Sequence, residues 1–296
     1  MRKLLLAVFL TAFAILGASA AEKKAIRFGL TAVVVRENLR FFDDMTEYLS
    51  HHVGQEVVFV RRKSYQEIME LLASGDLDFA WICGYPLVQK REPEFLSLVT
   101  VPVYKNQPYY RSYVIVHRDS TVKSIGELKN KVFAYSDPNS NSGYLYPRYH
   151  LSTEGHRPDS FFRQTFFTYN HAETVEAVAT RFADGGAVES YIWEFLQITN
   201  PDLVKKTRVI HESPKFGFPP IVSRNSVAPG IVRRMSETFA QMKDDPDGRK
   251  LLGALHLDGF RAYHIDLYED IRFMSENVAQ WTDVSSISGS RISGKQ

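Results

Sequence analysis

The chain has 296 residues, of which 44% are hydrophobic and 13% aromatic, so it can bury one large core or two medium-sized ones and shows no sign of disorder. Its 36 basic and 34 acidic residues nearly cancel, which disfavours nucleic acid and anionic membranes as partners. The single cysteine, Cys83, excludes an internal disulfide, and the apolar run before it predicts a buried small side chain rather than a nucleophile. We expect two α/β lobes.

The N-terminus is typical of a secretory signal peptide. A positive pair at residues 2–3 precedes an apolar run over residues 4–17, and small residues at 18–20 mark cleavage before Ala21. The apolar run is short for a membrane span, no stop-transfer pattern follows it, and no cysteine at the cleavage point indicates a lipid anchor. We therefore expect residues 1–20 to be removed from an exported protein that is not a lipoprotein.

The mature chain begins with a strand, a helix and a second strand. Ile26–Leu30 alternates apolar and polar residues, as a strand does. Apolar residues then recur at helical spacing over residues 39–49, Gly54 closes that helix, and a strand follows at 57–60. This order is a βαβ unit and indicates a mixed α/β lobe.

A second helix is predicted between Ser64 and Gly75. Ser64 and Glu67 have the spacing of a capping box, an apolar stripe follows, and Gly75 ends the helix before a strand at 79–83. Tyr65, at the start of this helix, is poorly placed for the apolar stripe. Half-buried packing would account for it without a ligand.

The middle of the chain continues with short strands. We predict strands over residues 95–101 and 113–117, separated by a tyrosine-rich loop that includes Tyr110. Half-buried packing is the ligand-free interpretation of Tyr110 as well. A short helix at 124–129 then delivers the chain to a strand at 132–135.

Residues 135–147, which read YSDPNSNSGYLYP, have the composition of an anion cradle. Ser140, Asn141 and Ser142 offer hydroxyl and amide groups, and Gly143 would let the backbone approach a bound group. A helix start here adds free N–H groups and the positive end of the helix dipole. A small oxyanion could therefore be held without any lysine or arginine.

The same loop also has a purely structural interpretation. Serine, asparagine and aspartate are common helix N-caps, and Asp137 with Pro138 would make the turn before the helix. Pro147 lies just beyond the first turn, where it should bend the helix or cut it short. From these residues alone, helix capping and anion binding both stay open.

The next segment repeats the plan of the helix that begins at Tyr65. A strand at 161–168 precedes a helix that begins near His171, and the glycines at 185–186 break this helix before another strand. His171 and Tyr65 then occupy comparable places, which suggests two similar lobes that present helix starts to a shared cleft. A capping or hydrogen-bonded structural histidine is the alternative for His171.

The last third of the chain contains an irregular segment and three helices. A strand at 208–212 precedes the proline-rich residues 213–220, which suit a return crossing between lobes. Helices are predicted near 231–239, 248–255 and 267–281, and residues 285–296 form a small, polar tail that we expect to be mobile. The amphipathic terminal helix leaves room for a homodimer.

Motifs for cofactors, metals and catalysis are absent from the sequence. Residues 289–295 fit G-x-x-x-x-G-K, but Gln296 stands where serine or threonine is required. The nine histidines include the neighbours His51 and His52, yet there is no H-E-x-x-H, no C-x-x-C and no G-x-S-x-G. We therefore expect a protein that is not an enzyme and has no metal or cofactor.

Residues 136–144, SDPNSNSGY, resemble the D-P-x-S-x-S-G signature of the phosphate-, phosphite- and phosphonate-binding proteins of ABC importers. Further segments match that family in order, at residues 110–116, 125–129 and 171–178. The resemblance covers nearly the whole mature chain. Together these segments identify the family. Taken one at a time, only the serine loop would indicate it.

The resemblance implies an α/β fold of two lobes, the type II periplasmic binding protein, in which each lobe is a mixed sheet flanked by helices and the ligand lies in the cleft between them. Lobe 1 would comprise residues 21–112 and 220–284, lobe 2 residues 113–219, and the tail residues 285–296. It also implies a periplasmic protein that closes on its ligand by a hinge and docks through both lobes on an ABC permease in the inner membrane.

The resemblance further assigns a ligand site, made of the serine loop at a helix start and three additional side chains. Its residues are Tyr65, Tyr110, Ser140, Asn141, Ser142, Gly143 and His171. All of these positions carry residue types that the family uses.

One departure from the family narrows the ligand. Family members that bind aminoethylphosphonate meet its ammonium group with two carboxylates, and the matching positions here are Tyr191 and Pro219, which cannot neutralise an amine. Glu189 lies nearby and could substitute. We include Tyr191 among the expected ligand contacts and predict phosphate, phosphite or a short alkylphosphonate rather than an aminoalkylphosphonate.

Three alternatives stay open on the sequence. A sensor that docks on a membrane histidine kinase would use the same fold and site. An enzyme on this fold would need an acid/base pair or a reactive lysine in the cleft, and the export signal counts against it. A metal-transport protein would need clustered carboxylates and histidines, which the expected cleft residues do not supply.

Overall fold

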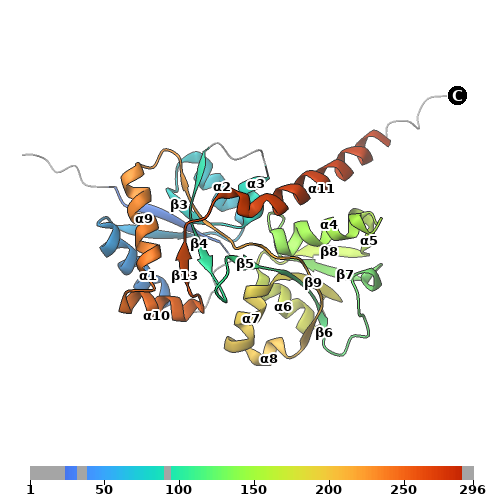
Figure 1. The fold of residues 1–296 in the computed structure, drawn as a ribbon. Coiled ribbons are helices and arrows are strands. Elements are labelled where there is room, and N and C mark those ends of the chain that lie inside the picture. Colours follow the sequence, from blue (N-terminus) through green and yellow to red (C-terminus); the bar gives the residue numbers. More distant parts are fainter. Residues whose placement is uncertain (1–23, 32–38, 90–94, 289–296) are drawn as a thin grey trace, which may run out of the picture.

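A computed structural model of the protein describes residues 24–31, 39–89 and 95–288, with side chains up to residue 278. The expected signal peptide, the G-x-x-x-x-G-K match at 289–295 and most of the expected tail lie outside the described residues. Two α/β lobes lie side by side and are joined by extended crossing segments (Figure 1). The predicted fold class is therefore confirmed.

The first lobe is built on a six-stranded mixed sheet in the order β13-β4-β12-β3-β1-β2. Strand β1 pairs in parallel with β2 and β3, while β12 is antiparallel to β3 and β4, and β13 is antiparallel to β4. The strands are β1 (Ile26–Leu30), β2 (Val57–Arg61), β3 (Phe79–Trp81), β4 (Leu96–Val103), β12 (Ile221–Arg224) and β13 (Gly259–Arg261).

Helices α1, α2, α3, α9 and α10 belong to this lobe, and aromatic side chains fill the core beneath them. The Phe28 ring stacks on Phe79 at 6.2 Å between centroids and also meets Phe239. The helices span α1 (Leu39–Val53), α2 (Tyr65–Ser74), α3 (Gly84–Val88), α9 (Pro229–Gln241) and α10 (Pro246–Leu255). The capping box that opens α2 and the left-handed Gly75 that ends it, at φ 87°, confirm the prediction for this helix.

The second lobe is built on a five-stranded sheet in the order β10-β6-β9-β7-β8. Strand β7 is parallel to β8 and β9, whereas β6 is antiparallel to β9 and β10. The strands are β6 (Ser112–His117), β7 (Val132–Tyr135), β8 (Gln164–Phe167), β9 (Gly185–Glu189) and β10 (Thr207–Glu212); the helices are η1 (Gly126–Leu128), η2 (Asn141–Leu145), α4 (Tyr146–Thr153), α5 (Pro158–Phe161), α6 (His171–Ala179), α7 (Ser190–Thr199) and α8 (Pro201–Val204).

Two short strands join the lobes, β5 (Tyr109–Tyr110) and β11 (Phe216–Gly217), and they pair with each other antiparallel. The chain enters the second sheet immediately after β5 and returns to the first sheet after β11. The turn η3 (Ile265–Tyr268) leads into α11 (Glu269–Ser288), which packs against α3 of the first lobe and α4 of the second (Figure 1). No helix in the described part of the chain has the length and apolar character to cross a bilayer.

Several local predictions differ from the structure. The glycines 185 and 186 do not break a helix but begin β9, because α6 has already ended before Arg181, whose φ is 62°. Gly186 is required by packing, since a Cβ there would lie 2.7 Å from Cγ2 of Thr174 on α6. Cys83 is not the end of a strand but the residue before α3. Helix α7 was not predicted, and α11 continues through the first residues of the expected tail.

Candidate functional site

The loop after β7 folds into a tight turn and then a helix start. The carbonyl of Asp137 accepts the Ser140 N–H at 2.9 Å, and its Oδ1 accepts the Asn139 N–H at 2.7 Å. Ser140 Oγ then accepts the Gly143 N–H at 2.9 Å and so caps η2, which is a single π-helical turn. The N–H groups at a helix start have no acceptors within the helix and point outward, so this turn aims backbone donors at whatever faces it.

The π-helical turn explains how Pro147 is accommodated. Proline has no N–H, so in a regular α-helix it would leave the carbonyl of Gly143 without its partner. In this turn the N–H of Leu145 instead reaches back to Ser140 O at 3.0 Å, and Gly143 O accepts the Ser136 N–H at 3.2 Å. Pro147 therefore does not cut α4 short; it stands in the first turn of this helix.

Gly143 is required by packing within the loop. A Cβ at this position would lie 2.5 Å from Cβ of Ser136. The Ser136 hydroxyl is itself buried and donates to the Ala187 carbonyl at 2.8 Å. The missing side chain thus lets the turn pack on the end of β7, and the approach of the Gly143 backbone to a bound group stays a prediction.

Asn141 connects the turn to the opposite lobe through two hydrogen bonds. Its Nδ2 donates to the Tyr110 hydroxyl on β5 at 3.0 Å, and its backbone N–H donates to Cys83 Sγ at 3.3 Å. Sulfur is a weak acceptor, and burial raises the pKa of the Cys83 thiol, so the thiol stays neutral. The prediction that Cys83 is buried is confirmed, but its contact with the serine loop was not foreseen.

The start of α2 meets the same loop from the other side. The Tyr65 N–H donates to Oδ2 of Asp137 at 3.2 Å, and the Tyr65 hydroxyl lies 3.5 Å from Nε2 of His171. Both lobes therefore contribute to one polar cluster, whose members are each at most 3% exposed. The cluster consists of Tyr65, Cys83, Tyr110, Asp137, Ser140, Asn141, Ser142, His171 and Glu189.

The hydrogen bonds of His171 fix its tautomer. Its Nδ1 accepts the backbone N–H of Glu189 at 3.1 Å, so the neutral ring carries its proton on Nε2 and donates toward the Tyr65 hydroxyl. Burial lowers the pKa of His171 to about 3, which keeps the ring neutral. Asn170 caps the helix that carries it, through a 2.7 Å bond from the Ala172 N–H.

Three side-chain oxygens of this cluster are buried without a hydrogen-bond partner among the described residues: Asn141 Oδ1, Ser142 Oγ and Glu189 Oε1. The Ser142 hydroxyl lies near the Tyr110 hydroxyl but does not form a hydrogen bond of good geometry with it. Buried polar atoms without partners cost about 1–3 kcal/mol each, so such a concentration at one place points to a binding function.

The cluster offers neutral donors rather than positive charge. Burial raises the pKa values of Tyr65 and Tyr110 well above their ordinary value, so both keep their protons. Tyr65 accepts from His171 and Tyr110 accepts from Asn141, so the O–H proton of each tyrosine is not used in these two bonds; the Tyr110 hydroxyl also lies beside Cys83 and Ser142. Together with Ser142, these groups can surround a small anion with hydrogen-bond donors.

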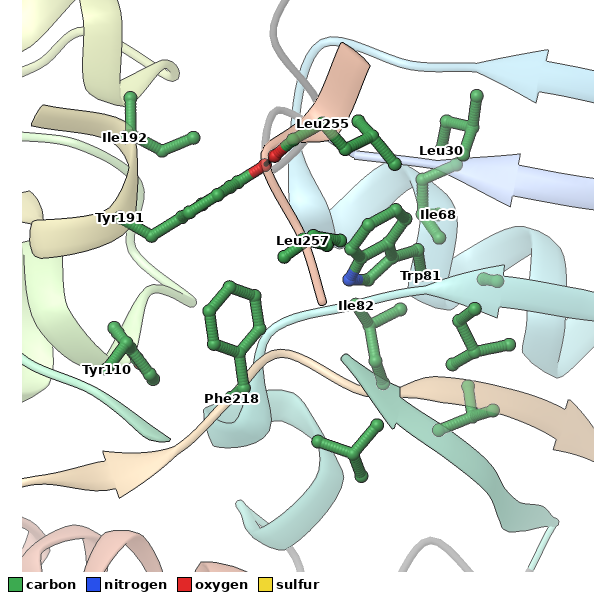
Figure 2. Packing of buried hydrophobic residues seen from close by; sticks show 14 of the residues in the cluster. Leu30, Ile68, Trp81, Ile82, Tyr110, Tyr191, Ile192, Phe218, Leu255 and Leu257 are labelled. Atoms are coloured by element: carbon green, nitrogen blue, oxygen red, sulfur yellow. Dashed lines mark hydrogen bonds between the residues drawn. The ribbon is translucent and has the colours of Figure 1, made fainter. Parts of the chain in front are cut away.

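Tyr191 lies apart from this arrangement. Its hydroxyl donates to the carbonyl of Leu255 on α10 at 2.6 Å, and its ring packs against Phe218 and Tyr104 at 5.2 Å between centroids. Figure 2 shows Tyr191 extending from α7 toward Leu255, across the contact between the lobes. The structure thus gives Tyr191 a packing role, and its contact with a ligand stays a prediction. Pro219 likewise has its carbonyl bound by the Trp81 indole.

Three cluster members were not among the expected ligand contacts. Asp137 read as a turn residue and Cys83 as a core residue, and nothing local in the sequence links either to the opposite lobe. Glu189 is considered in the sequence analysis only as a neighbour of Tyr191. A glutamate at the end of an apolar strand is nevertheless unusual, because carboxyl groups are rarely buried. The described residues include no group of three or more histidine, cysteine or acidic side chains arranged to hold a metal.

The sequence matches a known family over most of its length. Residues 28–268 match the family described as "ABC transporter, phosphonate, periplasmic substrate-binding protein". The chain is 25% identical to the phosphonates-binding periplasmic protein of Escherichia coli, over 81% of this chain and 73% of that protein. It is 24% identical to a probable ABC transporter phosphite-binding protein of Prochlorococcus marinus, over 83% of this chain and 82% of that protein.

Solved structures share the fold. A binding-protein component of an ABC phosphonate transporter from Pseudomonas aeruginosa superimposes with a TM-score of 0.79 at 23% identity, covering 91% of this chain and 90% of the other. A Prochlorococcus marinus protein in complex with methylphosphonate gives a TM-score of 0.77 at 19% identity, covering 87% and 99%. At these identities the likeness extends to the two-lobed architecture.

Proposed function

This chain belongs to the family of periplasmic substrate-binding proteins of phosphonate ABC transporters, and on that premise we propose that it binds a small phosphorus oxyanion between its lobes and delivers it to an ABC permease in the inner membrane. The ligand class comprises short alkylphosphonates, phosphite and phosphate. The protein is a transport component of the periplasm and not an enzyme. The cluster at the start of η2 is its binding site.

The observation that carries this proposal is the set of uncommitted donors in the buried cluster. The hydroxyls of Ser142, Tyr65 and Tyr110 retain protons to donate, and they come from both lobes. A tetrahedral oxyanion presents several strong acceptor oxygens in a small volume, which matches donors that converge from several directions.

The number of donors is sufficient for a useful affinity. A hydrogen bond to a charged group contributes about 1.5–3 kcal/mol. A micromolar complex requires about 8 kcal/mol, so roughly five or six such bonds suffice after the costs of association and ordering. The backbone N–H groups at the start of η2 would supply the remainder of the set.

A ligand held by both lobes couples binding to closure. Tyr65 and Tyr110 approach from the first lobe and the crossing, whereas Ser142 and His171 belong to the second lobe. An oxyanion bound to both sets stabilises the closed arrangement, and the pair of crossing strands is where the rotation would occur. The permease then recognises the closed protein through surfaces of both lobes.

We favour alkylphosphonate, phosphite or phosphate over an aminoalkylphosphonate. Tyr191 and Pro219, at the positions where the aminoethylphosphonate-binding relatives have carboxylates, cannot pair with an ammonium group. Their polar atoms are already bonded to Leu255 and Trp81. Tighter binding of aminoethylphosphonate than of methylphosphonate and phosphite, measured by calorimetry, would contradict this choice.

The site is tested with wild type, Ser140→Ala/Ser142→Ala and the control Ser152→Ala. Ser152 is a buried serine of α4 whose hydroxyl is satisfied by the Tyr149 carbonyl. We expect phosphite or methylphosphonate to raise the melting temperature of wild type and Ser152→Ala, and the double variant to bind at least about 100-fold more weakly, since it loses roughly two charge-assisted hydrogen bonds. Retained affinity in a folded double variant would overturn the site assignment.

A further inference from the structure

Glu189 is a buried carboxyl group with an incomplete set of partners. It ends β9, its side chain is 1% exposed, and its Oε1 has no hydrogen-bond partner in the described residues. Its other oxygen, Oε2, lies 3.8 Å from Nε2 of His171, beyond hydrogen-bond distance. The carboxyl therefore belongs to the same buried cluster as Ser142 and the two tyrosines but is not used by it.

The titratable groups that face Glu189 supply no compensating positive charge. His171 faces it from α6, Tyr65 from α2, Cys83 from the start of α3, Tyr110 from β5 and Tyr191 from α7. Each of these groups is neutral or becomes negative when it titrates, apart from His171.

The guanidinium of Arg111, next to the strand that pairs with β9, is bound elsewhere. Arg111 precedes Ser112, which lies opposite Glu189 in the β6–β9 register. Its Nη1 donates to the carbonyl of Ser213 at the crossing between the lobes. Within the described part of the chain, no lysine or arginine forms an ion pair with Glu189.

A buried carboxylate without a cation is costly, and it can be neutralised in only two ways here. His171 could become an imidazolium, but its Nδ1 already accepts the N–H of Glu189, and burial opposes the charge. The alternative is that the carboxyl keeps its own proton. Burial raises the pKa of Glu189 to about 8, which favours this second state near neutral pH.

We propose that Glu189 is a specificity-determining residue that meets the ligand as an uncharged carboxylic acid and donates a hydrogen bond to one oxyanion oxygen. This inference rests on the proposed function, whose site it completes. Binding of a fully ionised oxyanion then requires one proton on Glu189. Equivalently, a singly protonated oxyanion can bring that proton and share it with the carboxylate, so the complex contains one proton in either case.

A neutral Glu189 in the site would select ligands by their charge and their protonation state. A doubly charged phosphonate or phosphite is accepted beside a neutral acid, whereas it would be repelled by a carboxylate. An aminoalkylphosphonate would require the other protonation state of Glu189, since its ammonium group pairs with an ionised carboxylate. Glu189 cannot satisfy both, so donation to an oxygen and pairing with an amine are mutually exclusive.

The decisive measurement is the number of protons exchanged when phosphite binds. Calorimetry is carried out at pH 9 in two buffers that differ in ionisation enthalpy. At this pH free phosphite is fully ionised and free Glu189 is mostly a carboxylate, so we expect wild type to take up close to one proton per ligand. The affinity for phosphite should fall about tenfold for each pH unit above 8.

Glu189→Gln tests the residue, because its amide donates a hydrogen bond without titrating. We expect this variant to bind phosphite within about threefold of wild type at pH 6.5 and to exchange no proton at pH 9, so that it binds more tightly than wild type there. Glu176→Gln is the matched control, since Glu176 is an exposed acid on the helix that carries His171. It should behave as wild type at both pH values.

The outcomes separate the two proposals. If wild type binds none of phosphite, methylphosphonate and phosphate, the proposed function fails and this inference with it. If wild type binds phosphite at pH 9 without proton uptake, or if Glu189→Gln loses binding at pH 6.5 while its melting curve stays cooperative, the proposed function stands and the role of Glu189 is wrong. Tighter binding of aminoethylphosphonate that depends on Glu189 would also overturn it.

Discussion

Two helix starts face each other across the lobes, and they differ in how their donors are used. At α2 the Ser64 hydroxyl accepts the Glu67 N–H at 3.2 Å, Glu67 reaches back to the N–H of Ser64 at 3.1 Å, and the Tyr65 N–H finds Asp137 in the opposite lobe. At η2, Ser140 accepts one N–H and a thiol accepts another. The Ser142 hydroxyl has no hydrogen-bond partner among the residues described.

The comparison shows that residue type does not separate a capping serine from a binding serine. Both starts use serine, and both point toward the interface between the lobes. What differs is whether the protein supplies its own strong acceptors. At α2 two carboxylates accept the free N–H groups, as a bound anion would, whereas at η2 the acceptors from the other lobe are neutral: the sulfur of Cys83 and the hydroxyl of Tyr110. We infer that the first start stabilises the fold and the second is kept for a ligand.

The largest expected effect is the pH dependence of stability on the η2 side. The folded pKa of His171, about 3, lies below its ordinary value of 6.5, so its contribution to stability is complete above pH 6.5 and is lost as the pH falls toward 3. The shift corresponds to at most about 4–5 kcal/mol.

The test compares chemical denaturation between pH 7 and 4 in wild type, His171→Gln and Glu67→Gln. The raised pKa of Glu189 acts in the opposite sense over this range, because protonation of its buried carboxyl favours the folded state, so the two effects largely offset each other in wild type. His171→Gln should remove the loss that comes from the imidazole and should therefore gain stability relative to wild type as the pH falls. Glu67, which belongs to the capping box of α2, also has a lowered pKa because of its hydrogen bonds with Ser64, but it is exposed, so Glu67→Gln should leave the profile nearly unchanged. Equal profiles in wild type and His171→Gln would contradict the assignment.

Gly143→Ala should be the next most harmful change. The new methyl group would collide with Ser136, which is fixed by its bond to the Ala187 carbonyl, so we expect a loss of about 1–3 kcal/mol in the free energy of unfolding together with weaker phosphite binding. Urea denaturation and calorimetry measure the two effects. Gly253→Ala is the control, because a Cβ at that position meets no atom within 4 Å.

Ser64→Ala should separate stability from binding at the α2 start. Removing this N-cap costs about 1 kcal/mol of stability. Because the caps of α2 are satisfied within the helix, phosphite affinity should change by less than about threefold once the fraction of folded protein is taken into account. A large loss of affinity in Ser64→Ala would mean that the two helix starts are not distinct in function.

Substitutions of Cys83 give the smallest and most specific effect. Serine is a stronger acceptor than a thiol, so Cys83→Ser should hold the Asn141 N–H more firmly and weaken phosphite binding by about three- to tenfold. Cys83→Ala releases that N–H and should bind at least as tightly as wild type. Calorimetry on both variants checks the order; the reverse order would show that the thiol contact supports binding.

The parts of the fold that depend on neighbouring residues could be predicted from the sequence. Each of the correctly predicted features depends on residues that are close together in the sequence. These features are the capping box at Ser64, the glycine that ends α2, the serine loop and the helix start at His171. Length and composition favour two lobes, and the family resemblance adds the arrangement of the ligand cleft between them.

The parts that failed depend on contacts between distant segments. Asp137 accepts the Tyr65 N–H across 72 residues of sequence, and Cys83 meets Asn141 across 58, so neither could be read locally. Gly186 was misread because its requirement comes from packing against α6 rather than from a turn. Pro147 was misread because the carbonyl that it leaves free is bound by Ser136, from outside the helix.

Tyr110 belongs to the cluster and also to β5, the strand that pairs with β11 where the chain passes between the lobes. In a rotation, points near the axis travel least and points on long levers travel most. If the lobes rotate about this ribbon, Tyr110 lies close to the axis and moves less than the sheet of the first lobe. The hydrogen bond from Asn141 to Tyr110 would then be kept during opening, while the contacts of Tyr65 with Asp137 and His171 would be lost.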